Sequence, residues 1–105
     1  MANPRFDAGV APPTLSIEEE LSFQTAADIR VSLMDAFEQV SGELRIDVSA
    51  VGSFDLAGAQ LLYAAARTAE ERGIELSVEY GGNAERFAKF YRFAGLKPLG
   101  GDAEG

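Results

Sequence analysis

The feature of this sequence that most constrains its fold is the alternation of two hydrophobic periods along the chain. Some segments place apolar residues at every second position, which predicts half-buried strands. Between them lie stretches with apolar residues three or four positions apart, which predicts amphipathic helices. Strands and helices are expected in turn at about 14–18, 25–40, 44–49, 56–72, 74–80 and 84–94. This repeated order favours right-handed crossovers between parallel strands.

The alternation within the predicted strands also indicates how the layers are arranged. In the middle strand Leu44, Ile46 and Val48 lie on one side and polar residues on the other. Strands of a parallel sheet covered on both faces are usually apolar throughout. We therefore expect an α/β fold with a mostly parallel mixed sheet of about four strands and helices mainly on one face. A doubly wound nucleotide-binding fold is not expected.

Local signals predict where the helices begin and end. Gly42, Gly73 and Gly95 follow the three helices and are expected to adopt the left-handed conformation. Leu96 after Gly95 completes the pattern of a Schellman motif. Asn83 is expected to cap the third helix.

The two ends of the chain differ in composition from the segment between them. Residues 1–13 contain three prolines and a glycine, and they are expected to form a loose arm or a poor edge strand. Residues 100–105 are small and acidic, which favours a flexible tail. Residues 14–99 are expected to form one domain.

Composition narrows the range of functions. The 105 residues include no cysteine and no histidine, which excludes disulfides, thiolate metal sites and a Ser-His-Asp triad. The net charge of −8 disfavours nucleic acid and anionic membrane surfaces as ligands. No apolar run approaches the length of a membrane span and no signal peptide is evident. We expect a cytoplasmic protein that is not an enzyme and has no cofactor, metal or membrane insertion.

The most informative segment joins the second strand to the second helix. Residues 50–54 are expected to form a loop, and Asp55 is placed to cap the helix that follows. Gly58 lies in the first turn, where glycine costs up to about 1 kcal/mol relative to alanine. Its presence indicates that another segment packs closely there, or that the free N–H groups must be approachable, as in a phosphate-binding helix terminus.

Three stretches, LRIDVSAVGSFDLAGAQLL, ARTAEERGIELSV and FYRFAGL, resemble the STAS domain, the family of the anti-sigma-factor antagonists. The resemblance covers about residues 14–99, so a single STAS-like domain is the expected fold. The matching positions are 47–49, 55–58, Gly73 and 95–96.

The resemblance implies a signalling adaptor or switch that docks onto a partner protein. In the antagonists a kinase phosphorylates the serine just before the glycine of the helix, and here that position is Ala57, so the usual switch cannot operate at this site. Ser53 is the nearest loop hydroxyl and is a possible phosphosite. The partner is expected to be an anti-sigma factor, a histidine-kinase-type regulator of a chemotaxis-like complex, or the ATPase of a lipid-transport ATP-binding-cassette system. A monomer or weak dimer is expected.

The expected docking surface is the loop and the exposed side of the second helix. Its residues are Ser53, Phe54, Asp55, Leu56, Ala57, Gly58, Gln60 and Tyr63. On the third helix an apolar stripe is expected to join the core, with a further aromatic residue partly exposed beside it. The stripe is Phe87, Phe90, Tyr91 and Ala94, and the partly exposed residue is Phe93.

Two alternatives stay open. A receiver-like phosphoacceptor domain would use the acidic residues Glu19, Glu20 and Asp55 together with Lys97. A small-molecule or nucleotide binder would use the N-terminus of the second helix.

Overall fold

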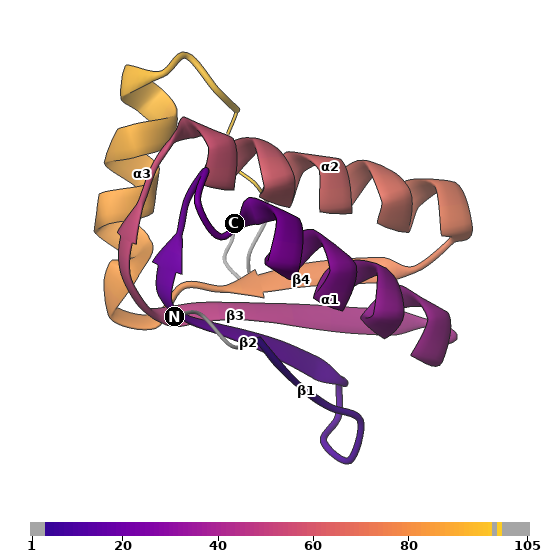
Figure 1. Ribbon diagram of the computed structural model, residues 1–105. Coiled ribbons are helices and arrows are strands. Elements are labelled where there is room, and N and C mark those ends of the chain that lie inside the picture. The colour runs from indigo at the N-terminus through magenta and orange to yellow at the C-terminus, as the bar shows by residue number, and fades with distance from the viewer. Residues whose placement is uncertain (1–3, 98, 100–105) are drawn as a thin grey trace.

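The computed structural model describes residues 4–97 and 99 as one α/β unit built on a four-stranded mixed sheet (Figure 1). The strand order is β1-β2-β3-β4; β1 is antiparallel to β2, and β2, β3 and β4 are parallel. The elements are β1 (Arg5–Asp7), β2 (Thr14–Leu21), α1 (Ala26–Gln39), β3 (Glu43–Phe54), α2 (Leu56–Arg72), β4 (Glu75–Glu79), the 3₁₀ turn η1 (Gly81–Asn83) and α3 (Ala84–Phe93). The expected α/β fold is confirmed.

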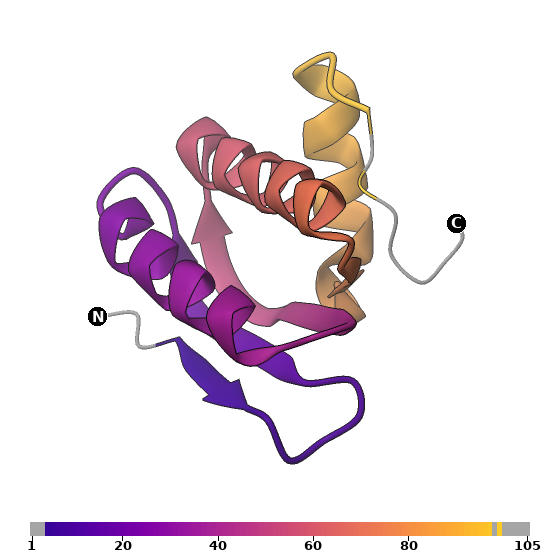
Figure 2. The same cartoon turned by 90° about the vertical axis from the view of Figure 1, so that its right-hand side faces the viewer.

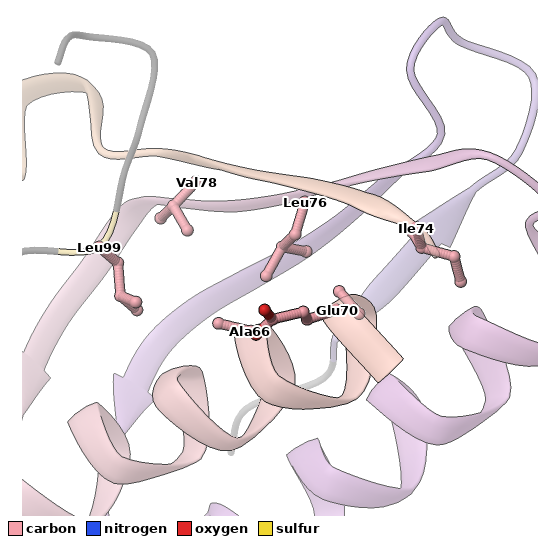
Figure 3. Close-up of a pocket in the computed structure, with 7 residues that line it drawn as sticks. Ala66, Glu70, Ile74, Leu76, Val78 and Leu99 are labelled. Atoms are coloured by element: carbon pink, nitrogen blue, oxygen red, sulfur yellow. The ribbon is translucent and has the colours of Figure 1, made fainter. Parts of the chain in front are cut away.

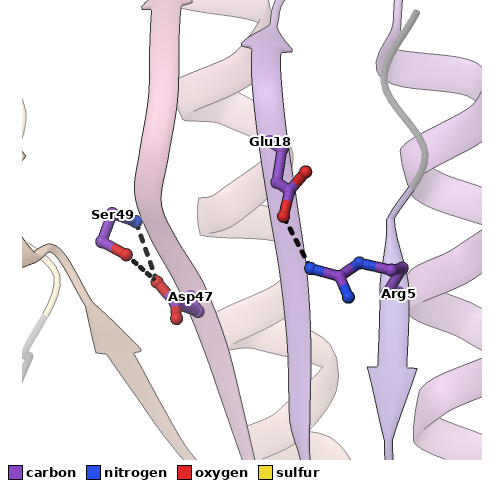
Figure 4. Close-up of polar contacts among 4 residues, drawn as sticks. All are labelled: Arg5, Glu18, Asp47 and Ser49. Carbon is purple, nitrogen blue, oxygen red and sulfur yellow. Dashed lines mark hydrogen bonds and ion pairs between the residues drawn. The ribbon is translucent and has the colours of Figure 1, made fainter.

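The two faces of the sheet have different surroundings, as the alternation predicted. Helices α1 and α2 lie side by side over one face, and α3 stands at one end of the sheet (Figures 1 and 2). The apolar positions of β2 and β3, among them Ile17, Ile46 and Val48, are buried in the core. The opposite face is polar: Arg5 pairs with Glu18 at 2.7 Å (Figure 4).

The N-terminal segment contributes an edge strand. Residues Arg5–Asp7 pair with β2, with Arg5 opposite Ser16 and Asp7 opposite Thr14. Of the two expectations for this segment, the structure therefore contains the edge strand. The tail at 100–105 lies outside the described residues.

The second predicted strand is longer than its alternation indicated, and the predicted loop at 50–54 is wrong. β3 continues to Phe54 and pairs with β2 as far as Leu21. Its register shifts twice, so that Ser49 and Ala50 are both exposed before Val51 returns to the core. Such bulges interrupt the period of two without ending the strand. The end of β3 bends away from the plane of the sheet (Figure 2).

Two of the three predicted glycine caps are confirmed. Gly73 and Gly95 have φ of 70° and 73°. After Gly95, the Leu96 amide donates to the Tyr91 carbonyl at 2.7 Å and the Gly95 amide donates to the Arg92 carbonyl at 3.2 Å, which is a full Schellman motif. Gly42 is not a left-handed cap, because α1 ends at Gln39 and the next residue is already extended.

The aromatic stripe of α3 is partly confirmed. Phe87 and Tyr91 are fully buried and Phe90 is half-buried. Ala94 is exposed, because it follows the last residue of the helix where the chain turns away from the core. Phe93 is 92% exposed, more than the partial exposure expected. No helix in the described part of the chain has the length and apolar character of a membrane span.

Candidate partner-binding site

The candidate site lies where β2 and β3 end, at the same edge of the sheet. The last residues of the two strands, Leu21 and Phe54, are paired. The chain then enters two connections, residues 22–25 leading to α1 and Asp55 leading to α2. Parallel strands bring these connections together although they are some 30 positions apart in sequence, as Figure 1 shows.

Asp55 holds the two connections together with one carboxylate. Its Oδ1 accepts a hydrogen bond from the Gly58 amide at 3.0 Å, which is the predicted N-cap of α2. Its Oδ2 accepts from the Phe23 amide at 3.1 Å, and the Asp55 amide donates to the Leu21 carbonyl at 3.3 Å. The start of α2 and the start of the β2–α1 connection are therefore fixed relative to each other.

Gly58 permits the close approach of these two segments. A Cβ at this position would lie 2.1 Å from the Leu21 carbonyl oxygen and 2.8 Å from its carbon. Of the two explanations that the sequence left open, close packing is the one observed. The amide of Gly58 is already bonded to Asp55.

The β2–α1 connection has a hydrogen-bond network of its own that the sequence analysis did not predict. The Thr25 hydroxyl donates to the Glu20 carbonyl at 3.0 Å and accepts from the Ser22 amide at 3.1 Å. The Ser22 hydroxyl donates to the Glu20 carboxylate. The hydroxyl residues just before α1 were the available signal, since serine and threonine are typical of such turns.

Two large apolar side chains are exposed on this fixed backbone. Phe23 is 78% exposed and Leu56, which follows Asp55, is 47% exposed; the Asp55 carboxylate accepts a hydrogen bond from the Phe23 amide. We call Phe23, Asp55 and Leu56 the loop surface. Leu56 was among the predicted docking residues, whereas Phe23 was missed because nothing local to its sequence links it to Asp55.

The other predicted docking residues divide into exposed and inward-facing groups. Ser53 and Gln60 are exposed, and Ala57 is half-buried in the first turn of α2. Phe54 is half-buried and its ring stacks on that of Phe87 with centroids 4.0 Å apart. The structure therefore brings Ser53 and Gln60 to the surface near the loop surface, but directs Phe54 toward α3.

Tyr63 also faces α3 rather than solvent. Its ring packs edge-on against Tyr91 with centroids 5.8 Å apart. Its hydroxyl is buried and has no hydrogen-bond partner in the described part of the chain. Burial raises the pKa of Tyr63 above its ordinary value. The expectation that Tyr63 is free for solvent or a partner is wrong for its hydroxyl.

A clamp from the start of α3 holds the bulged end of β3. The Asn83 side-chain amide donates to the carbonyls of Val48 and Val51, both at 2.9 Å. Arg86 donates to the Asn83 side-chain oxygen at 2.7 Å and to the Gly52 carbonyl at 2.9 Å. Asn83 is the N-cap residue of α3, as predicted, but its side chain makes no capping hydrogen bond to the helix. The bulges leave strand carbonyls without a partner in the neighbouring strand, and these carbonyls accept hydrogen bonds from the Asn83 side-chain amide instead.

A separate cavity of about 330 Å³ lies between α2 and β4 (Figure 3). Its lining is apolar apart from Glu70 and comes from the second half of α2, from the turn to β4, from β4 itself and from the segment that follows α3. The lining residues are Ala66, Ala69, Glu70, Ile74, Leu76, Val78 and Leu99. None of them belongs to the N-terminus of α2, where a small-molecule or nucleotide site was considered.

The acidic residues considered for a receiver domain do not form a metal site. Within residues 4–97 and 99, no group of three or more acidic side chains is arranged to hold a metal ion. Asp55 is committed to the Gly58 and Phe23 amides. On the polar sheet face, Asp47 is bonded to its neighbour Ser49, whose amide and hydroxyl donate to one carboxylate oxygen (Figure 4).

Comparisons with known proteins agree with this architecture. The family model described as "Mlab, STAS domain" matches residues 5–100, a range that includes β1. A chain in a crystal structure of Mglu is similar in fold, with a TM-score of 0.62 at 17% identity. The similarity covers 71% of this chain but only 19% of that one, so this chain spans about a fifth of the length of the protein it matches. No curated protein matches the sequence.

Proposed function

The chain belongs to the STAS domain family, and on that premise we propose that it is a cytoplasmic signalling adaptor that docks onto a partner regulator through the loop surface. Domains of this family generally serve as regulatory or binding modules rather than as catalysts. The partner we propose is an anti-sigma factor or a histidine-kinase-type signalling protein. Ser53 and Gln60, exposed beside the loop surface, complete the polar margin of the contact.

The observation that carries this proposal is the exposure of Phe23 and Leu56 on a backbone that is already fixed. Asp55, Gly58 and the Ser22–Thr25 network hold both connections by backbone contacts. A backbone that is already held in place loses little further conformational freedom when its side chains bind a partner. Apolar anchors surrounded by polar groups are typical of the centre of protein interfaces.

Control of the docking is proposed to differ from that of the antagonists. Ala57 offers no hydroxyl in the first turn of α2. The domain is proposed to bind without a switch at that position, or to be controlled at Ser53, which is exposed at the end of β3. A phosphate there would add negative charge next to the apolar anchors and weaken their burial.

The test is recovery of the tagged full chain with bound proteins from native lysate, followed by binding measurements with the purified partner. The double variant Phe23→Ser and Leu56→Ser is expected to weaken the partner's binding about tenfold or more, because each substitution removes an apolar anchor. Thermal unfolding followed by circular dichroism checks that the variant stays folded. Mass spectrometry of the recovered chain reports whether Ser53 carries a phosphate.

The matched control is Val31→Ser, which removes an exposed apolar side chain from α1 instead. It is expected to bind the partner as the unaltered chain does. Asp55→Lys is less informative, because it removes the cap of α2 as well as changing the surface. A partner that tolerates the double variant would contradict the proposed surface. Recovery of an ATP-binding-cassette ATPase through this surface would favour the lipid-transport alternative.

A further inference from the structure

The third helix and the turn after it carry positive charge in an acidic chain. Four of the nine basic residues lie within residues 84–97, namely Arg86, Lys89, Arg92 and Lys97, and this stretch contains one acidic residue, Glu85. It therefore has a net charge of +3, in a chain whose net charge is −8. The helix stands at one end of the sheet, beside α2 (Figure 2).

Two of these cations remain available on the outer side of α3. Arg86 is engaged with Asn83 and Gly52. By contrast, Lys89 and Arg92 are exposed and form no ion pair with any residue of 4–97 and 99. Arg92 and Phe93 follow Lys89 by three and four positions, so all three lie on the same side of the helix.

An aromatic side chain lies among these cations. Phe93 is 92% exposed, although it belongs to a helix whose other aromatic residues include the buried Phe87 and Tyr91. A shallow depression of about 530 Å³ is lined by Lys89, Phe90, Arg92 and Phe93. We call these four residues the α3 surface. It combines an apolar floor with two cations that lack a described partner, a composition unlike that of the loop surface.

From this arrangement we propose that the α3 surface binds an acidic peptide segment of a partner protein, one that places an apolar side chain between its carboxylates. The carboxylates pair with Lys89 and Arg92, and the apolar side chain packs on Phe90 and Phe93. Charge complementarity supports an anionic occupant, because the surface is the basic part of an acidic protein.

A peptide fits these observations better than an anionic membrane does. A flat membrane surface would face the acidic remainder of the molecule along with α3, and the net charge of −8 opposes that approach. A peptide segment needs to contact only the depression. The loop surface is not required for this binding. Phe54, which precedes Asp55, packs edge-on against Phe90 with ring centroids 5.1 Å apart.

The probe is a short fluorescein-labelled peptide that alternates glutamate with leucine and phenylalanine, and the measurement is fluorescence anisotropy with the full chain. The control peptide has glutamine in place of glutamate. The acidic peptide is expected to bind at least about tenfold more tightly than the control, and to weaken as salt rises toward about 0.5 M. A dissociation constant above about 1 mM for the acidic peptide overturns the proposal.

Three variants assign the binding to the α3 surface. The double variant Lys89→Glu and Arg92→Glu is expected to lower the affinity for the acidic peptide about tenfold or more. Phe93→Ser alone is expected to do the same. Arg67→Glu, which reverses an exposed charge on α2, is expected to leave the peptide's affinity within about twofold. Circular dichroism checks that every variant is folded. Peptide binding that survives the double variant overturns the proposal.

Two further measurements separate the proposal from its alternatives. The loop variant Phe23→Ser and Leu56→Ser is expected to keep its affinity for the peptide, so loss of peptide binding in that variant overturns the α3 assignment. Co-sedimentation with phosphatidylglycerol vesicles is expected to be absent. Vesicle binding that depends on Phe93 and Arg92, without peptide binding, overturns the proposal in favour of a membrane ligand.

Discussion

The first turn of α2 contains a glycine whose low helix propensity is offset by close packing. Gly58 faces the backbone of Leu21, and the helix approaches β2 more closely than any residue with a Cβ would allow. The approach brings the Asp55 carboxylate within reach of the Phe23 amide. A single position without a side chain therefore determines how the two connections of the loop surface meet.

We predict that Gly58→Ala destabilises the protein by about 1–3 kcal/mol. Alanine improves helix propensity by about 1 kcal/mol, but its Cβ would be 2.1 Å from the Leu21 carbonyl oxygen, and the backbone on both sides must move. Urea unfolding measures the change in the free energy of unfolding. Hydrogen exchange of the Phe23 amide is expected to become faster, because the same movement lengthens its bond to Asp55.

Gly82→Ala is the matched control. A Cβ at Gly82 would meet no atom within 4 Å, and Gly82 is not among the glycines with positive φ. This variant is expected to change the free energy of unfolding by less than about 0.5 kcal/mol. Equal effects of the two substitutions would mean that close packing at Gly58 is not the reason for its presence.

Among the elements, β3 shows what a local pattern can and cannot predict. The strands were predictable where apolar and polar residues alternate, as in Leu44, Ile46 and Val48, because burial on one face imposes that period. Past Ser49 the bulges shift the alternation of buried and exposed residues. The local pattern therefore predicts a loop where the strand continues. The bulges are stabilised by Asn83, more than 30 positions away, and no local pattern contains that information.

In the candidate site, too, local contacts were predictable from the sequence and long-range contacts were not. The cap by Asp55 was predictable because its acceptor and donor lie three residues apart, within one helical turn. The bond from the Phe23 amide joins residues 32 positions apart and depends on the pairing of β2 with β3. The inward direction of Tyr63 likewise depends on where α3 packs.

We predict that Asn83→Ala destabilises the protein by about 2 kcal/mol. The carbonyls of Val48 and Val51 would lose their buried amide donor, and leaving buried acceptors unpaired costs about 1–3 kcal/mol. Urea unfolding measures the loss, and hydrogen exchange of residues 48–54 is expected to become faster. Glu85→Ala, at an exposed position two residues later, is the control and is expected to be near neutral. A loss at Asn83 no larger than at Glu85 would show that the clamp is not needed for the bulges.

At the scale of the whole molecule, few groups can change the stability at high pH. The chain has no cysteine or histidine, and its two lysines, Lys89 and Lys97, are both exposed. Its three tyrosines lie in α2, just after β4 and in α3. Tyr80 and Tyr91 are joined by a bond between their hydroxyls at 3.1 Å, and Tyr63 packs on Tyr91. Alkaline titration therefore reports mainly on how α2, β4 and α3 pack together.

We predict that the free energy of unfolding falls above about pH 10, most steeply through Tyr91. Burial, together with the hydrogen bond to Tyr80, raises the pKa of Tyr91 far above its ordinary value of 10.0. The unfolded chain therefore loses this proton first, and the slope approaches about 1.4 kcal/mol per pH unit as the pH rises past about 11. Urea unfolding between pH 8 and about pH 11 measures the slope. Tyr91→Phe is expected to remove about 1.4 kcal/mol of the stability loss between pH 8 and pH 11, whatever it costs at neutral pH through the lost bond to Tyr80. A slope that is the same in both proteins would mean that Tyr91 ionises as readily in the folded chain as in the unfolded one, and would contradict its burial against Tyr63 and Tyr80.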